Sequence, residues 1–499
     1  MQSLVAADAD RIQDLIFRSS RLREIIGGSF ALEEFWKGVA ANAERRGARV
    51  LAAAGGTFRA LFDGAAAEAE AFARDLRDAY ARETGGAVTA VIVSGEEATV
   101  LLRSAAAELA REKLRGDPPA ASVHLPYLQP CDSCARDLAG GRFSPEGREE
   151  DQREEEKQDL CRICALRRRE RDAFKTAFLE QVRTAARERE LEVGSLSELP
   201  EDANQVGSLD GRARVAYLLA DGNGFGRFFG EAAKLGDGKD CAVYSDLSAR
   251  VSAAGAQALA AATASLAAKV PALSGGRAPV LPLITGGDDI FALLPAAWAF
   301  VFAREFAVAF VERMREAELF TFRADLVPSI SCALVFCKAT FPYRFAHEAG
   351  EEALRQAKRV AREHPGTSVV RGVELRAMSG GATGLDREYG VFALEVPEAP
   401  TTPLLSVSAL LWARGALQPR LPGKRRHQIE ALYASGDRGG AAWEARRARI
   451  FERTGGGEQA QTHLDGLVSG PDDGARDAVV DLLHLWDFLA EPATTKAAR

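Results

Sequence analysis

Apolar positions recur along this chain in an order that predicts two copies of one α+β unit. Short apolar runs bounded by turn residues are typical of buried strands, and apolar residues three or four positions apart are typical of helices. Residues 1–117 are expected to form, in order, strand 1–8, helix 30–46, strands 49–54 and 57–62, helix 65–81, strand 87–94 and helix 105–114. This order predicts an antiparallel sheet covered by helices, as in ferredoxin-like or palm domains.

The same order returns in residues 206–400, where we expect a second palm domain. Its predicted elements are strand 215–220, helix 242–270, a pair of strands joined at 286–287, helix 295–317, strand 328–336 and helix 346–363. The Ala-rich helix comes closest to a membrane span, but polar residues interrupt it, so a packed helix is expected. A repeat of this kind indicates two related domains.

The remaining segments differ from the palms in composition. Residues 118–205 begin with a Pro-rich linker at 118–130, carry two cysteine pairs around a charged stretch, and continue as a charged helix at 164–190 and a polar loop at 192–208. Residues 401–499 are predicted to form a helical domain with helices 404–417, 427–435, 442–452 and 475–489. The fold class is therefore α+β: two ferredoxin-like palms of the GGDEF or cyclase kind, a four-cysteine element and a C-terminal helical domain.

Composition narrows the class of protein. The 499 residues are 47% hydrophobic and 27% charged, as in soluble globular proteins. A net charge of -7 argues against a general nucleic-acid coat. The N-terminus lacks the cationic start and apolar core of a signal peptide. We therefore expect a cytoplasmic protein with no membrane partner.

The strongest chemical candidate is the turn Gly286-Gly287-Asp288-Asp289, which lies between two apolar runs. Asp221 ends the first strand of the same palm, and in a palm sheet that strand lies beside the hairpin. Three carboxylates in one place repel one another, and divalent cations relieve the repulsion. Mg²⁺ or Mn²⁺ prefers oxygen ligands, and two such ions activate a 3′-hydroxyl and stabilise a leaving pyrophosphate. Asp221, Asp288 and Asp289 are thus the predicted catalytic and metal-binding residues.

The first palm offers an internal comparison for this turn. Its Gly-Gly turn at 55–56 aligns with the Gly-Gly turn at 286–287, and Thr57 and Phe58 then stand where the second palm has its two acids. An ordinary charged turn is the alternative interpretation, because Asp and Gly are common in turns. The uncharged copy indicates that the turn forms without acids, so the acids of the second copy favour a catalytic role.

A phosphate site is predicted beside the aspartates. Gly222, Asn223, Gly224 and Phe225 follow the strand and open a helix, so backbone N–H groups can approach phosphates there. The two glycines of the acidic turn also leave room for a nucleotide. Lys358, on the helix after the last strand, could reach a phosphate as a point charge. The alternatives are a flexible loop and a solvated lysine.

Four of the seven cysteines form two Cys-x-x-Cys pairs: Cys131, Cys134, Cys161 and Cys164. This pattern predicts a tetrahedral Zn²⁺ site, and four thiolates leave no open position, so the ion would be structural. A redox motif or an iron–sulfur cluster is the alternative. The other three cysteines are expected to be buried small hydrophobes.

Two stretches near the N-terminus, 9–17 and 21–29, add to a family resemblance. Together with the uncharged first palm, the four cysteines, the Gly-Gly-Asp-Asp turn and the helical C-terminus, they make the chain resemble the large polymerase/cyclase-like subunit of type III CRISPR effector complexes. The resemblance covers most of the chain. It implies that the second palm converts ATP into cyclic oligoadenylates in antiviral defence when target RNA is bound, with the three aspartates in catalysis and Lys358 near phosphate.

The resemblance also implies partners, namely other effector subunits and guide and target RNA, and it leaves a homo-oligomer open. Many members of that family begin with a His-Asp nuclease domain, whereas this sequence starts at the first palm. The resemblance therefore gives no reason to assume DNase activity.

Two other functions stay open at this stage. One is a diguanylate-cyclase-like enzyme that uses GTP, which Asp-Asp in place of the usual acidic-Glu-Phe ending weakly disfavours. The other is a non-catalytic scaffold subunit of a ribonucleoprotein, in which the palms only pack, and the retained acids of the second palm argue against it.

Overall fold

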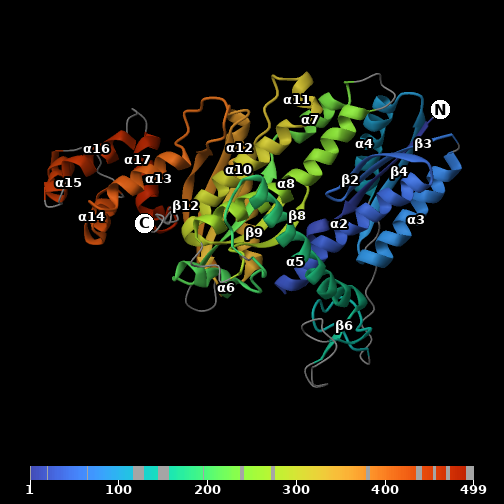
Figure 1. The fold of residues 1–499 in the computed structure, drawn as a ribbon, viewed down its shortest axis with the longest axis horizontal. Coiled ribbons are helices and arrows are strands. Elements are labelled where there is room, and N and C mark those ends of the chain that lie inside the picture. The colour runs from blue at the N-terminus through green and yellow to red at the C-terminus, as the bar shows by residue number, and fades with distance from the viewer. Residues whose placement is uncertain are drawn as a thin grey trace.

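The two palm sheets and a helical region follow one another along an elongated molecule, with the N-terminal palm and the C-terminal helices at opposite ends (Figure 1). The computed structural model describes residues 2–19, 21–64, 66–115, 128–143, 157–194, 196–235, 241–270, 276–377, 383–433, 441–452, 457–467 and 473–490. Residues 118–127 of the predicted linker and residues 146–156 of the charged stretch between the cysteine pairs lie outside the described residues. The predicted α+β class is confirmed.

The first palm is a four-stranded antiparallel sheet in the order β2-β3-β1-β4. Its strands are β1 (Gln2–Asp10), β2 (Ala48–Ala54), β3 (Thr57–Asp63) and β4 (Ala87–Gly95). Its helices are α1 (Ile12–Ile16), α2 (Leu22–Arg45), α3 (Ala66–Thr84) and α4 (Ala98–Arg115). Alternate residues of β1 enter two different cores, one below α2 and α3 and one below α4, as a sheet covered on both faces requires.

The second palm is a six-stranded sheet in the order β12-β11-β10-β7-β9-β8. Its strands are β7 (Arg214–Gly222), β8 (Leu281–Gly286), β9 (Asp289–Pro295), β10 (Ile330–Lys338), β11 (Ser368–Ala377) and β12 (Thr383–Leu394). Its helices are α7 (Phe225–Ala232), α8 (Ala242–Lys269), α10 (Ala299–Arg315), α11 (Glu318–Phe322) and α12 (Tyr343–Glu363). The four strands β10-β7-β9-β8 repeat the antiparallel order β4-β1-β3-β2 of the first palm, which confirms the predicted repeat.

Strands β11 and β12 extend the second sheet beyond the predicted repeat. β11 pairs in parallel with β10, and β12 pairs antiparallel with β11. β12 carries many charged residues, so its sequence lacks the apolar run of a buried strand. These strands join the second palm to the C-terminal helices α13 (Val407–Leu417), α14 (Gly423–Tyr433), α15 (Ala441–Glu452), α16 (Gly457–Leu467) and α17 (Asp473–His484).

Helix α2 begins eight residues earlier than its apolar spacing predicts, and it includes Gly27 and Gly28. These glycines are needed because α2 crosses α5 (Arg162–Glu188) at close range. A Cβ atom on Gly27 would lie 1.7 Å from the carbonyl oxygen of Arg167. The pattern of side chains could not reveal this, since the contact is between backbones.

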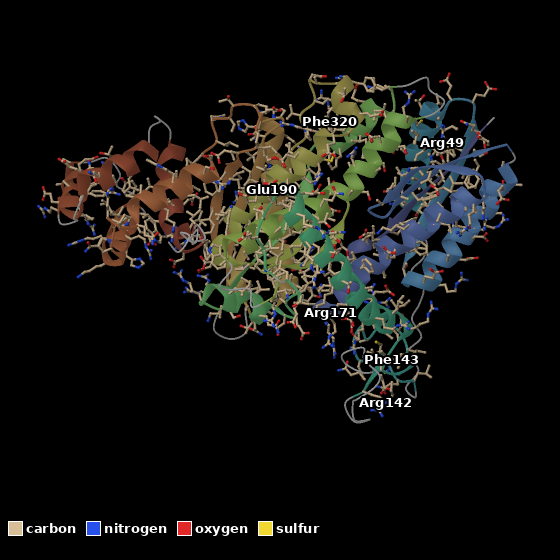
Figure 2. All side chains as sticks on the ribbon, in the orientation of Figure 1. Arg49, Arg142, Phe143, Arg171, Glu190 and Phe320 are labelled. Atoms are coloured by element: carbon tan, nitrogen blue, oxygen red, sulfur yellow. The ribbon has the colours of Figure 1, made fainter. Side chains whose placement is uncertain are left out.

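The four-cysteine element projects from the side of the molecule near the start of α5. It contains the short strands β5 (Gly141–Phe143) and β6 (Gln158–Leu160), which pair antiparallel. Arg142 and Phe143 mark its outer part in Figure 2. The rest of α5 returns to the body and packs against α2 and α8, so this helix connects the element to both palms.

The register of the two hairpins corrects one detail of the internal comparison. Thr57 is the first residue of β3 after a two-residue turn, and Asp289 is the first residue of β9 after its own two-residue turn. Thr57 therefore corresponds to Asp289, and Gly56 corresponds to Asp288. The alignment of the glycine pairs, which set Thr57 and Phe58 against the acids, is wrong by one residue. The first palm still lacks both acids.

One continuous hydrophobic core runs from the first palm through the second palm to the C-terminal helices. α8 lies within it. By length and apolar composition α8 alone, among the helices of the described residues, would suit a membrane span, yet 72% of its most apolar stretch is buried inside the protein. This agrees with the predicted packed helix. The predicted boundaries between the four domains stay predictions.

The contact between α2 and α5 predicts opposite effects for two glycines of one helix. Gly27→Ala would force the helices apart and lower stability by ~1–3 kcal/mol, the usual cost of overpacking. Gly38→Ala would meet no atom within 4 Å and gain ~0.5–1 kcal/mol from helix propensity. Apparent unfolding temperatures of the two variants check this, and equal shifts would contradict the close contact.

Candidate active site and four-cysteine centre

The three predicted aspartates meet at one end of the second sheet. Asp221 lies next to the last residue of β7, opposite Ser331 of β10. Asp289 begins β9, and Asp288 lies in the turn before it. The carboxyl groups of Asp221 and Asp289 both act on that of Asp288 and raise its pKa, so the three side chains lie close together. The palm sheet therefore brings together residues that are 67 positions apart in the chain (221 to 288).

Crowding perturbs the acidity of both turn residues. Burial, then Asp289 and Asp221, raise the pKa of Asp288 to about 7. The pKa of Asp289 is raised to about 6 by desolvation from the surrounding protein and by Asp221, although the residue is exposed to solvent. Carboxyl groups that hold protons near neutral pH are typical of sites built to receive a cation.

Lys358 supplies one positive charge to this cluster. Its ammonium group forms an ion pair with Asp221, and both side chains are about one quarter exposed. Lys358 extends from α12 across the end of β7, so the predicted phosphate-binding lysine is also the counter-ion of a predicted metal ligand. A bound cation would compete with Lys358 for Asp221 and free the lysine for a phosphate.

Asn223 fixes the loop between β7 and α7. Its amide donates to Ser329 Oγ at 3.1 Å, and its amide oxygen accepts a hydrogen bond from Ser331 Oγ at 2.8 Å. Its backbone N–H donates to the Ser329 carbonyl at 2.9 Å. The side chain of Asn223 thus holds the glycine-rich loop against β10, and a direct contact of that side chain with a nucleotide stays a prediction.

The two glycines of this loop have different roles. A Cβ atom on Gly222 would lie 2.2 Å from the ring of Phe225, so the ring packs flat against the backbone. Phe225 also contacts the rings of Phe228 and Phe310. Gly224 has a φ of 75° and is the N-cap of α7. Phe225 therefore packs within the domain, and its predicted contact with a nucleotide stays a prediction.

A cavity of about 330 Å³ opens beside the Asp221–Lys358 pair. The glycine-rich loop, the residues before β10 and the C-terminal part of α12 line it. Three cationic side chains reach it: Arg227, Lys358 and Arg362. Neither arginine is among the site residues predicted from the sequence. Arg362 follows Lys358 by four residues and so lies on the same face of α12, a spacing that could have been noticed.

The acidic turn faces the first palm. A Cβ atom on Gly287, whose φ is 64°, would lie 4.0 Å from the Cα atom of Gly55, so the two hairpin turns approach each other. Gly255 of α8 lies against the carbonyl oxygen of Gly287 from another side. Gly286 has no neighbour of this kind within 4 Å. The acidic turn thus has neighbours in the first palm, whereas the cavity is lined by residues of the second palm.

The first palm retains part of the same arrangement without the acidic turn. Asp8, the counterpart of Asp221, forms an ion pair with Arg59 at 2.9 Å and lies 3.6 Å from Lys113 of α4. Asp10 lies 3.8 Å from Lys113 and accepts hydrogen bonds from Thr89. Protein cations therefore balance the carboxylates in this palm.

The four predicted zinc ligands come together in the projecting element. Cys131, Cys134, Cys161 and Cys164 are buried, and their sulfur atoms all lie within 4.8 Å of one another. Cys161 is the N-cap of α5 and accepts a hydrogen bond from the backbone N–H of Cys164 at 3.4 Å. Four thiolates in this arrangement fit a tetrahedral Zn²⁺ ion, since its ligand sulfurs each lie about 2.3 Å from the metal.

Within the described part of the chain, these sulfurs are the group of ligand atoms that is close enough to share an ion without movement. The three aspartates offer the oxygen ligands that Mg²⁺ and Mn²⁺ prefer, but their side chains would have to turn toward a bound ion.

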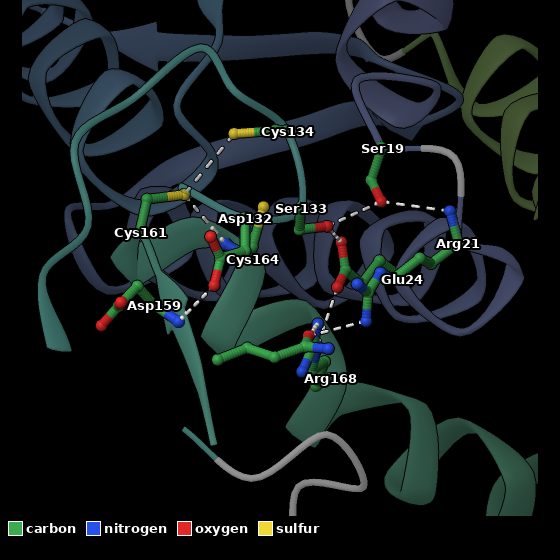
Figure 3. A network of polar contacts seen from close by, with 11 residues as sticks. Ser19, Arg21, Glu24, Asp132, Ser133, Cys134, Asp159, Cys161, Cys164 and Arg168 are labelled. Carbon is green, nitrogen blue, oxygen red and sulfur yellow. Dashed lines mark hydrogen bonds and ion pairs between the residues drawn. The ribbon is translucent and has the colours of Figure 1, made fainter. Parts of the chain in front are cut away.

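A buried polar network ties the four-cysteine element to the first palm (Figure 3). Glu24 of α2 is fully buried and forms an ion pair with Arg168 of α5 at 2.8 Å. Ser133, between the first two cysteines, donates to Glu24 and lies 2.9 Å from Ser19. Arg168 also donates to Gln158 at 2.7 Å. A buried charge pair with these extra hydrogen bonds tolerates the loss of either partner poorly.

Comparisons with known proteins agree with this geometry. Residues 214–364 match the family model of the Cas10/Cmr2 second palm domain. The structure is similar to Csm1 of T. onnurineus, with a TM-score of 0.56 and 14% identity over 98% of this chain and 69% of that chain. It is also similar to a Csm1–Csm4 cassette in complex with cA4, and to one in complex with one ATP. Both have a TM-score of 0.54 and 14% identity over 98% of this chain and 70% of the other. No curated protein sequence matches the chain.

The fold is that of a two-palm protein whose second palm carries an acidic turn. More particularly, residues 214–364 are similar to the second palm of Cas10/Cmr2, and the whole chain has the fold of Csm1. The predicted resemblance to the large subunit of type III CRISPR effector complexes is confirmed.

The four-cysteine centre predicts a measurable metal content. The purified chain should carry one zinc ion, and Cys164→Ser should lose the ion and lower the unfolding temperature, because the thiolates stabilise the element through the metal. Cys337→Ser, which alters a buried cysteine of β10, should keep the zinc. Elemental analysis and thermal unfolding check this. Iron in place of zinc, or a full metal content in Cys164→Ser, would contradict the assignment.

The acidic turn predicts a pH-dependent stability. The pKa of Asp288 rises from 3.8 to about 7 on folding, so its favourable contribution is fully present below pH 3.8 and is lost as the pH rises through about 7. The metal-free protein should therefore unfold at a lower temperature at pH 8 than at pH 6, and Asp288→Asn should reduce this difference.

Added Mg²⁺ or Mn²⁺ should raise the unfolding temperature of the wild type at pH 8 more than that of Asp288→Asn. Thermal unfolding of both proteins at the two pH values provides the measurement. Identical pH profiles would show that the carboxyl groups are not coupled as described.

Proposed function

We propose that this protein is a metal-dependent nucleotidyltransferase that makes cyclic oligonucleotides of the cyclic oligoadenylate class from ATP in CRISPR antiviral defence. One observation carries the proposal: three aspartates gather at one end of the second sheet, beside a cavity that three cationic side chains line. The carboxylates can bind the metal ions that accompany a nucleoside triphosphate, and the cationic side chains can bind its phosphates.

The binding step follows from charge. The cavity of about 330 Å³ accepts a triphosphate, which Arg227, Lys358 and Arg362 neutralise while the N-terminus of α7 offers backbone N–H groups. Asp221, Asp288 and Asp289 would hold Mg²⁺ or Mn²⁺, which lowers the pKa of the attacking hydroxyl and stabilises charge on the leaving group. Lys358 then exchanges its contact with Asp221 for one with a phosphate.

The chemical step is a phosphoryl transfer. The 3′-oxygen of one nucleotide forms a bond to the α-phosphorus of another, the bond from that phosphorus to the β-phosphate oxygen breaks, and the hydroxyl proton passes to water. Pyrophosphate leaves into the cationic cavity. The protein contributes position and electrostatics rather than a covalent intermediate. Repetition of this step and a final intramolecular attack yield a ring.

The proposed biological setting is a type III CRISPR effector. Similar structures are Csm1–Csm4 cassettes, including one from the type III-A CRISPR-Csm interference complex, and some are complexes with ATP or cA4. These relatives support effector subunits as partners and ATP as substrate. Guide and target RNA as activators, a homo-oligomer and a cytoplasmic location stay predictions, as do base preference and ring size.

The test is incubation of the purified chain with each labelled nucleoside triphosphate and Mg²⁺ or Mn²⁺, alone and with partner subunits and target RNA. ATP should give cyclic or linear oligonucleotides. Asp288→Ala with Asp289→Ala should reduce the product by 10³-fold or more, because the metal ligands of a two-metal site act together. The product is measured by chromatography and mass spectrometry.

A matched control replaces two acids that lie outside the site. Asp75→Ala with Asp78→Ala removes two carboxylates from the surface of α3 and should leave the product unchanged. Product from GTP alone would favour the diguanylate-cyclase-like alternative. No product from any triphosphate, even within an RNA-bound complex, would favour the scaffold alternative.

A further inference from the structure

A fourth carboxylate, Glu351, lies beside the three aspartates. The metal-binding role proposed for the aspartates does not include it. It occupies α12 seven residues before Lys358, which is two helical turns, so both side chains lie on one face of the helix. Gly350 allows this approach, because a Cβ atom there would lie 2.3 Å from the side chain of Leu219 in β7. Glu351 is thereby held against the strand that carries Asp221.

Glu351 interacts with the aspartates through space. Burial and then Asp221 raise its pKa, and Glu351 in turn helps to raise the pKa of Asp289. Placing another carboxylate in this group costs stability, since like charges at short range repel one another. The side chain is nevertheless 38% exposed, so it is open to a ligand.

The first palm lies next to this carboxylate. The side-chain amide of Gln13 on α1 is close enough to Glu351 to lower its pKa. Phe17, at the end of α1, stacks on Tyr343 and lies with its ring centre 4.3 Å from that of His347, both on α12. The hydroxyl of Tyr343 donates a hydrogen bond to the backbone carbonyl of Ser19 at 2.9 Å, and Ser19 lies just before α2. α1 is therefore firmly attached to the helix that carries Glu351.

An ion pair with His347 does not account for Glu351. The two side chains are 3.7 Å apart, but burial lowers the pKa of His347 to about 4, so the imidazole is neutral at neutral pH. The direct contacts of the carboxylate are thus with a neutral amide and a neutral ring. Lys358 and Arg355 lower its pKa through space. The charge therefore remains available to a hydrogen-bond donor from solution.

The cavity and Glu351 have different neighbours. The cavity is lined by residues of the second palm up to Pro400, and no residue of the first palm contributes to its lining. Gln13 lies near Glu351, and Gly55 lies near the acidic turn, and both residues belong to the first palm. In phosphoryl transfer the attacking and leaving oxygens are roughly in line. If pyrophosphate leaves into the cavity, the attacking nucleotide approaches from the side of the first palm.

We propose that Glu351 binds the ribose of the acceptor nucleotide, the one whose 3′-hydroxyl attacks, by accepting hydrogen bonds from its hydroxyl groups, and that Gln13 positions the carboxylate. A carboxylate that recognises the hydroxyls of a ribose is established chemistry in nucleotide sites. This inference rests on the proposed function, and it assigns donor and acceptor nucleotides to opposite sides of Asp221.

The experiment separates acceptor from donor. The acceptor is the linear dinucleotide pppApA, and the donor is 3′-deoxy-ATP, which can be added once but cannot itself attack. Transfer is measured with the full chain, together with any partner subunits and RNA that its activity needs. Glu351→Ala should raise the KM for pppApA about tenfold, the usual effect of one lost hydrogen bond to a charged group, and should leave the KM for 3′-deoxy-ATP within about twofold.

Two further variants make the result specific. Glu351→Gln keeps an acceptor oxygen and should give a smaller rise in the acceptor KM, and it serves if Glu351→Ala does not fold. Glu352→Ala removes the neighbouring carboxylate, which is bonded to Arg355 and Gln356 on the same helix, and should change neither KM. Gln13→Ala should act in the same direction as Glu351→Gln.

The inference is overturned if Glu351→Ala and Glu352→Ala have the same KM for pppApA. It is also overturned if Glu351→Ala raises the KM for 3′-deoxy-ATP as much as the KM for pppApA, because Glu351 would then serve the donor or the metal ions. In both cases an active wild type leaves the proposed function intact. A wild-type chain that transfers nothing would overturn the proposed function, and this inference with it.

Discussion

Repulsion among carboxylates is the constraint on which the second palm depends. The sheet brings Asp221, Asp288 and Asp289 together, and the protein pairs one cation, Lys358, with Asp221. This cation does not neutralise the group fully, as the raised pKa values of Asp288 and Asp289 indicate. Carboxylates that are not fully neutralised cost stability, and they favour the binding of a cation together with a phosphate.

The first palm meets the same constraint in a different way. Asp8 has both an arginine and a lysine nearby, so its charge is balanced by the protein itself. The lysine comes from the helix equivalent to α12, which means that the Asp–Lys pair belongs to the repeated unit. What differs is the turn: the first copy has Gly56 and Thr57 where the second has acids. In the first palm the protein's own cations thus balance the carboxylates, whereas in the second palm the protein's cations balance them only in part.

A short segment of the first palm connects the two candidate sites. Residues 13–19 contact α12 through Gln13, Phe17 and the carbonyl of Ser19, and they contact the four-cysteine element through Arg18, which forms an ion pair with Asp137 at 2.7 Å. The hydroxyl of Ser19 reaches Ser133 in the same element. The position of α12, and with it that of Lys358, therefore depends on packing between domains as well as on the second sheet.

The sequence by itself determined the repeat, the fold class, the acidic turn and the four cysteines, because each is a local pattern: alternation of apolar residues, a Gly-Gly-Asp-Asp run, two Cys-x-x-Cys pairs. Only the tertiary structure decided the rest. The register of the hairpins depends on pairing across the sheet, so aligning glycines set it wrong by one residue. The early start of α2 depends on a backbone contact with α5.

The cationic cavity and Glu351 depend on residues that are far apart in the chain and become neighbours through the crossing of α12 over β7. A lone arginine or glutamate on a helix has no distinguishing pattern, and its partner is decided by which surface the helix covers. Local spacing is written in the sequence, whereas the meeting of distant side chains exists only once the sheets and helices have packed.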